Sequence, residues 1–202
     1  LSFTDGKVVK PMVSSMDHKR ANDHDTGLNT GGMGTVAPQP LLHPGRCCRV
    51  HGKDLPAHHS GHERRGLPLQ GLPVLRLMLT PDGPKVIEYN CRFGDPETQV
   101  VLPLLEGDLL HIMQLHGRHA GKRGGQVLGR CCRLRHSGFR RLPGGLREGK
   151  PITGLVDGQL PDEENVTVYH SGTAITEDGT LGSRPAAVCW VSPPPAAADQ
   201  LR

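Results

Sequence analysis

Three polar residues near the middle of the chain have types and a spacing suited to metal and phosphate chemistry. Glu88, Asn90 and Arg92 stand at alternate positions of the segment KVIEYNCRFGDPETQVVLP, residues 85–103. Alternate side chains of a β-strand share a face, so these three are predicted to lie side by side. Oxygen ligands suit Mg²⁺, and a guanidinium can hold a phosphate by two hydrogen bonds. The alternative is an edge strand whose polar face meets water, since so short a pattern has little specificity.

The neighbouring sequence predicts the strand that would carry these residues. Val86, Ile87 and Tyr89 favour strands, and the Pro-Asp-Gly run at residues 81–83 favours a turn. A second β-prone run precedes that turn. Residues 75–90 are therefore predicted to form an antiparallel hairpin.

The first forty residues hold a second group of candidates. Residues 1–11 predict a hairpin that turns at an Asp-Gly pair. The polar run at residues 17–20, DHKR, favours a solvated loop. Residues 23–38 are rich in glycine, which lets backbone N–H groups approach an anion closely, so we expect a flexible binding loop there. It is not a Walker loop, because no Gly-Lys-Ser/Thr closes it.

Two of these segments resemble a known family. VIEYNCRFGDPETQ resembles the metal-binding strand of ATP-grasp ligases, and RFGDPETQ narrows the resemblance to the phosphoribosylamine-glycine ligases, also called glycinamide ribonucleotide synthetases. FTDGKVVKPMVSSMDHKR and DTGLNTGGMGTVAP are similar to the same family, and GKPITGL and VTVYHSGTAI are weaker matches. Leu28 departs from the family, which generally has proline there.

The resemblance implies a fold and an activity. The fold class is α/β: the C-terminal half of an ATP-grasp domain over residues 1–120, then a partial, partly disordered, small β-rich domain over residues 121–202. The activity is ATP-dependent ligation of glycine to 5-phosphoribosylamine, giving glycinamide ribonucleotide, ADP and phosphate in purine biosynthesis. The N-terminal portion of the enzyme is expected to be missing from this chain. We therefore expect the chain alone to be an inactive fragment.

The resemblance also implies roles for single residues. Glu88 and Asn90 would hold Mg²⁺ or Mn²⁺ against the phosphates of the co-substrate ATP, and Arg92 would stabilise charge on the transferred group. The small-molecule substrates would be bound by Asp25, Asn29, Gly31, Gly32, Met33, Gly34 and Asp95.

Composition limits the other function classes. Aromatic residues make up 3% of the chain, so a base-stacking platform is not expected, although the net charge is +4. No apolar run is long enough to span a membrane. Six cysteines in no secreted pattern favour a reducing cytoplasm. We expect no nucleic-acid or membrane partner, with a basic RNA-binding or zinc-binding protein as the weaker alternative.

Three segments match neither the family nor any regular period. Residues 41–74 contain Cys47, Cys48 and several histidines, but their spacing fits no usual zinc site. Permissible codons for residues 50–59, 69–74 and 187–194, read in a shifted frame, encode helix-forming and strand-forming segments like those of the family. We predict that residues near 41–75, 117–149 and 182–202 are out-of-frame translations that lack the elements expected there. A helix is predicted after Pro103, and short strands over residues 150–175.

Overall fold

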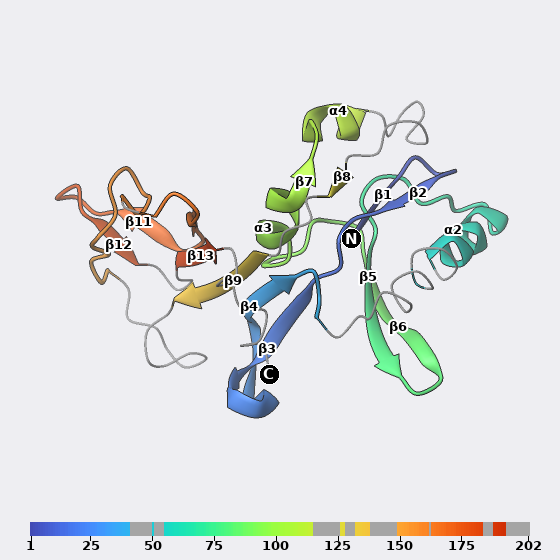
Figure 1. Cartoon of the computed structure of the whole chain (residues 1–202), viewed down its shortest axis with the longest axis horizontal. Helices are drawn as coiled ribbons and strands as arrows, with labels where there is room; N and C mark the ends of the chain where they lie inside the picture. Colours follow the sequence, from blue (N-terminus) through green and yellow to red (C-terminus); the bar gives the residue numbers. More distant parts are fainter. Residues whose placement is uncertain are drawn as a thin grey trace. The chain divides into compact units, whose positions relative to one another are not determined.

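The computed structural model describes residues 1–40, 50, 55–114, 126–127, 132–137, 149–161, 163–183 and 188–192 (Figure 1). The chain divides into two compact units, each built from separate stretches. Unit 1 comprises Leu1–Ser14, Pro38–Gly94 and Leu104–Gly129, and unit 2 comprises Ser15–Ala37, Asp95–Pro103 and Arg130–Arg202. No helix within the described ranges is long and apolar enough to cross a membrane.

Unit 1 begins with the predicted N-terminal hairpin. Strands β1 (Ser2–Thr4) and β2 (Val9–Pro11) pair antiparallel, which confirms the prediction. Its turn forms because the Asp5 carboxylate accepts the backbone N–H groups of Lys7 and Val8 at 2.9 and 2.8 Å. Phe3 and Met12 are buried and contribute to the core of this unit.

The second hairpin of unit 1 carries the candidate metal ligands. Strands β5 (Val74–Thr80) and β6 (Gly83–Asn90) pair antiparallel, as predicted. The register shifts between Arg76 and Leu77, and Met78, Ile87 and Tyr89 remain exposed. Simple alternation predicts one apolar and one polar face for this hairpin. The structure does not show that separation.

Four further elements lie in the described part of unit 1. Helix α4 (Leu109–Gln114) confirms the helix predicted after Pro103, and the Asp108 carboxylate accepts the His111 N–H at its start. Strand β7 (Leu105–Glu106) pairs with β8 (Gln126–Val127). Helix α2 (Leu55–Arg64) contributes His62, whose ring meets the Tyr89 ring edge to face at 5.6 Å. Partial burial raises the pKa of the Tyr89 phenol.

Unit 2 is organised around an antiparallel sheet with strand order β10-β13-β9-β4-β3. The bounds are β10 (Thr167–His170), β13 (Val188–Ser192), β9 (Cys132–Ser137), β4 (Thr26–Ala37) and β3 (Met16–Asn22). The 3₁₀ turn η1 (Asp23–Asp25) joins β3 to β4. The short helix α3 (Thr98–Val101) contacts β4 and β9 and buries Val100 and Val101; η3 (Leu102–Leu104) follows it.

Two expected loops of unit 2 are strands. The glycine-rich segment expected to be a flexible loop forms β4, and the polar run expected to be a solvated loop forms β3. Both expectations are wrong because they considered local composition alone. Strand β4 has a partner on each side, β3 and β9, and its last four residues, 34–37, are buried. Long-range pairing thus overrides the loop preference of glycine.

The segments assigned to a shifted reading frame also contain regular structure. Helix α2 and strands β9 and β13 lie within them, so the expectation that they lack helix and strand is wrong for these stretches. Strand β13 also lies within residues 121–202, the domain expected to be partly disordered. The origin of the segments in a shifted frame stays a prediction that the nucleotide sequence of the gene tests.

Strands β11 (Thr173–Ile175) and β12 (Leu181–Ser183) form a hairpin whose turn depends on a carboxylate. Asp178 accepts hydrogen bonds from the Thr176 hydroxyl and from the Thr180 N–H, the latter at 3.1 Å. The Thr176 bond first, and then the bonds from Thr180, lower the pKa of Asp178.

Because folding lowers this pKa, the turn gains stability above the ordinary value of 3.8 and loses it as the pH falls through the folded value. We expect the Thr180 amide resonance to titrate with a midpoint below 3.8 in an NMR pH series. Asp178→Asn should abolish this transition. A midpoint at or above 3.8 would contradict the assignment.

Candidate metal and substrate sites

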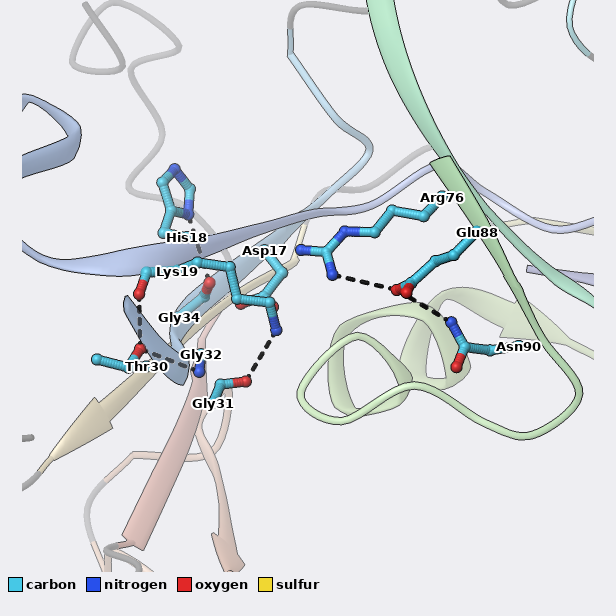
Figure 2. Close-up of polar contacts among 10 residues, drawn as sticks. All are labelled: Asp17, His18, Lys19, Thr30, Gly31, Gly32, Gly34, Arg76, Glu88 and Asn90. Carbon is cyan, nitrogen blue, oxygen red and sulfur yellow. Dashed lines mark hydrogen bonds and ion pairs between the residues drawn. The ribbon is translucent and has the colours of Figure 1, made fainter. Parts of the chain in front are cut away.

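The two candidate metal ligands lie together at the end of β6. Asn90 Nδ2 donates a hydrogen bond to Glu88 Oε1 at 3.3 Å, which confirms that these side chains share a face (Figure 2). Across the hairpin, Arg76 Nη1 approaches the same oxygen at 3.3 Å, and Arg76 and Glu88 are register partners. Both side chains of this ion pair are almost half exposed.

Arg92 lies beyond the end of the strand that carries Glu88 and Asn90. Strand β6 ends at Asn90, the chain bends at the next two residues, and the Arg92 guanidinium donates to the Phe93 carbonyl oxygen at 2.8 Å. The predicted alignment of Arg92 with Glu88 and Asn90 is therefore wrong, because it required the strand to continue. The catalytic role of Arg92 stays a prediction.

In unit 2, side chains of β3 hold the main chain of the glycine-rich strand β4. Lys19 Nζ donates to the Gly31 carbonyl oxygen at 2.9 Å, and the Lys19 carbonyl oxygen accepts the Thr30 hydroxyl at 2.8 Å. The Gly32 N–H donates to that hydroxyl oxygen at 3.2 Å, and His18 Nδ1 lies 3.3 Å from the Gly34 carbonyl oxygen. These contacts, drawn in Figure 2, fix the path of the chain through residues 30–34.

A buried carboxylate anchors this arrangement. Asp17 forms an ion pair with Lys19, and its side chain is only 4% exposed. Gly32 has a φ of +143°, and a Cβ there would lie 2.8 Å from Asp17 Oδ1 and 2.8 Å from Pro96 Cδ. Asp17 and Lys19 were not singled out from the sequence, although their alternate spacing in a polar run was the available signal.

The remaining substrate candidates are distributed around unit 2. Asp25 and Asn29 are exposed, and Asp25 has a positive φ of 55° within η1. Asp95 Oδ1 accepts Gln99 Nε2 at 2.7 Å. Met33 lies in β4 between two of the candidate glycines. Thus all the substrate candidates lie in unit 2, whereas both metal candidates lie in unit 1.

The donor set at the end of β6 fits a hard divalent cation. It supplies one carboxylate and one amide oxygen on partly exposed side chains, which leaves room for water and phosphate oxygens. Among the residues that the structure describes, no three His, Cys, Asp or Glu side chains gather to hold a metal ion. Cys47 and Cys48, considered for zinc, lie outside the described residues.

Comparison with known proteins shows that the chain is similar to an ATP-grasp family. Residues 1–98 match the family model described as "Phosphoribosylglycinamide synthetase, ATP-grasp (A) domain". The resemblance stated from the sequence is confirmed: the chain is a relative of the phosphoribosylamine-glycine ligases.

Individual relatives agree with the family match. The chain is 38% identical over 189 residues to the phosphoribosylamine-glycine ligase of Synechocystis sp., covering 90% of this chain and 43% of that protein. It is 40% identical over 184 residues to the ligase of Listeria monocytogenes, covering 89% and 42%. A crystal structure of the ligase from Thermotoga maritima matches with a TM-score of 0.73 at 27% identity, covering 94% of this chain and 46% of that one. The chain therefore spans less than half the length of these relatives.

Proposed function

We propose that this chain contributes the metal-binding and amine-substrate elements of an ATP-dependent ligase that joins glycine to 5-phosphoribosylamine. The observation that carries the proposal is the contact between Glu88 and Asn90 at 3.3 Å, at the end of β6 and inside the segment matched to the family. A carboxylate and an amide side by side on one strand can each supply an oxygen ligand to a Mg²⁺- or Mn²⁺-nucleotide.

The proposed reaction has two steps. The glycine carboxylate attacks the γ-phosphorus of ATP, giving glycyl phosphate and ADP, and the amine of 5-phosphoribosylamine then attacks the glycyl carbonyl and displaces phosphate. A cation held by Glu88 and Asn90 would neutralise phosphate charge. Arg92 is exposed at the end of β6, where its guanidinium can turn from the Phe93 carbonyl to the transferred group.

The glycine-rich strand supports the amine-substrate half of the proposal. Its path is fixed by Lys19 and Thr30, so the backbone groups of Gly31, Gly32 and Gly34 are held in place before a ligand arrives. A main chain that is held in place in advance needs little reorganisation when a ligand binds. Asp25, Asn29 and Asp95 are the polar side chains of unit 2 that we assign to the phosphoribosylamine.

The proposal also assigns the residues of this chain to domains of the enzyme. Residues 1–120 belong to the C-terminal half of the ATP-grasp domain and residues 121–202 to a partial β-rich domain, with the N-terminal portion of the same enzyme as partner. The chain's share of 43% of the Synechocystis ligase supports this assignment. Without that portion an acyl phosphate is not shielded from water, so the chain alone should release no ADP in response to glycine and phosphoribosylamine. The pattern of cysteines supports a cytoplasmic site of action.

The metal assignment can be tested on the chain itself. We expect Mn²⁺ to broaden the amide resonances of Glu88 and Asn90 selectively, and Glu88→Gln to weaken Mn²⁺ binding about tenfold or more, since it removes a charged ligand. Glu63→Gln, which removes an exposed carboxylate of α2 in the same unit, is the matched control. Equal Mn²⁺ affinity in the two variants would refute the assignment.

Ligase activity can be tested by segment exchange. The segment of the Listeria monocytogenes ligase that matches residues 1–98 is replaced by those residues, and ADP release is measured with and without each substrate. We expect release that requires both glycine and phosphoribosylamine and that Glu88→Gln abolishes. A folded exchange protein that hydrolyses ATP without regard to either substrate would argue against the proposed function.

A further inference from the structure

We propose that Arg76 occupies the position of the cation beside Glu88, and that a divalent cation binds only when this guanidinium withdraws. The inference rests on the proposed function, because it assumes that Glu88 and Asn90 are the metal ligands. It assigns to Arg76 a positioning role: the residue sets the affinity of the site without itself binding metal.

The contacts of Glu88 are the basis for this inference. One oxygen, Oε1, faces two donors, Arg76 Nη1 and Asn90 Nδ2, each at 3.3 Å (Figure 2). A divalent cation bound at Oε1 would lie within a few ångströms of the guanidinium. Like charges at that separation repel each other, so the two cations compete for one carboxylate oxygen.

The orientation of Asn90 supports the same conclusion. Its amide presents the NH₂ group to Glu88, whereas a metal ligand must present the carbonyl oxygen Oδ1. Cation binding therefore needs two local changes, withdrawal of Arg76 and rotation of the Asn90 amide by about half a turn. In the arrangement described, both neighbours donate to the same carboxylate oxygen.

The position of Arg76 in the hairpin makes withdrawal feasible. Its side chain is 44% exposed, and an exposed ion pair contributes little to stability, so breaking it costs little. The register shift directly after Arg76 is the irregularity in the pairing of β5 with β6. An exposed arginine beside such an irregularity can leave the carboxylate without disturbing the remaining pairing.

The test measures Mn²⁺ affinity on the 202-residue chain. In about 0.1 M salt we expect Arg76→Met to tighten Mn²⁺ binding about threefold to tenfold, because it removes both the competing donor and the repulsion. Lys85→Met removes the same charge from β6, but at the position paired with Met78 rather than with Arg76, so we expect a change of less than about twofold. In about 1 M salt the difference between the two variants should shrink, because the Debye length falls to about 3 Å.

A second measurement follows the replacement of the Arg76 guanidinium by the metal ion directly. During a Mg²⁺ titration of the unsubstituted chain, the Arg76 side-chain Nε resonance should shift with the same midpoint as the Asn90 side-chain amide. A purely structural ion pair would leave the Arg76 resonance unchanged.

The outcomes separate this inference from the proposed function. In one outcome Mn²⁺ binds, Glu88→Gln abolishes the binding, and Arg76→Met changes the affinity no more than Lys85→Met does. The role of Arg76 is then refuted, and the metal site stands. If the chain shows no Mn²⁺ binding that depends on Glu88, the metal site itself is refuted, and this inference with it.

Discussion

Replacing Lys19 by methionine is expected to destabilise unit 2 by about 3 kcal/mol, because the substitution leaves a buried carboxylate without its counter-charge. The Asp17 side chain is 4% exposed and Lys19 forms its ion pair, with a quarter of the lysine side chain still reaching solvent. The substitution also removes the hydrogen bond from Nζ to the Gly31 carbonyl oxygen. Loss of one partner of a buried pair costs far more than the intact pair contributes.

The measurement is urea-induced unfolding followed by fluorescence of Trp190. This residue is the single tryptophan of the sequence and lies in β13, so its signal reports on the five-stranded sheet. Arg20→Met is the matched control: Arg20 is exposed, and its guanidinium donates to the Gly27 carbonyl oxygen, so we expect a loss below about 1 kcal/mol.

A double substitution separates charge from packing. Adding Asp17→Asn to Lys19→Met removes the uncompensated charge, so the double variant should be more stable than Lys19→Met alone. If the double variant is less stable, or if Lys19→Met loses no more than Arg20→Met, the buried charge is not what makes Lys19 important.

Elements with their own turn signals were predictable from the sequence. The hairpins β1-β2 and β5-β6 each reverse direction at an Asp-Gly pair, so their strands are neighbours in the sequence and local chemistry determines their pairing. The adjacency of Glu88 and Asn90 followed from strand alternation in the same way.

The sheet of unit 2 was not predictable by these means. Strand β4 pairs with β3 and with β9, which is distant in the sequence. No local sequence pattern predicts the pairing of β4 with β9. The polar run of β3 looked like a solvated loop, yet its alternate members Asp17 and Lys19 turn toward the glycine main chain. The prediction for Arg92 went wrong because a local pattern was applied too far. The alternation that placed Glu88 and Asn90 was extended past the end of the strand. Local patterns thus located the candidate ligands, but the contacts that hold β4 depend on the tertiary structure.

Substituting alanine for Gly32 is expected to have the largest effect on stability, a loss of about 3–4 kcal/mol that combines backbone strain with a steric clash. The φ of +143° is one that L side chains rarely adopt. The added Cβ would stand 2.8 Å from Asp17 Oδ1 and 2.8 Å from Pro96 Cδ. Neither neighbour can yield easily, because the carboxylate is paired with Lys19 and the Pro96 ring is fully buried.

The adjacent residue provides the control for this prediction. A Cβ at Gly31 would meet nothing within 4 Å, and its φ lies outside the positive range, so Gly31→Ala should cost less than about 1 kcal/mol in the same urea experiment. Amide exchange at residues 30–34 should accelerate in Gly32→Ala and stay unchanged in Gly31→Ala, since only the first displaces Asp17 from Lys19. Equal losses of stability in the two variants would show that the close approach of Gly32 to Asp17 and Pro96 does not determine the path of β4.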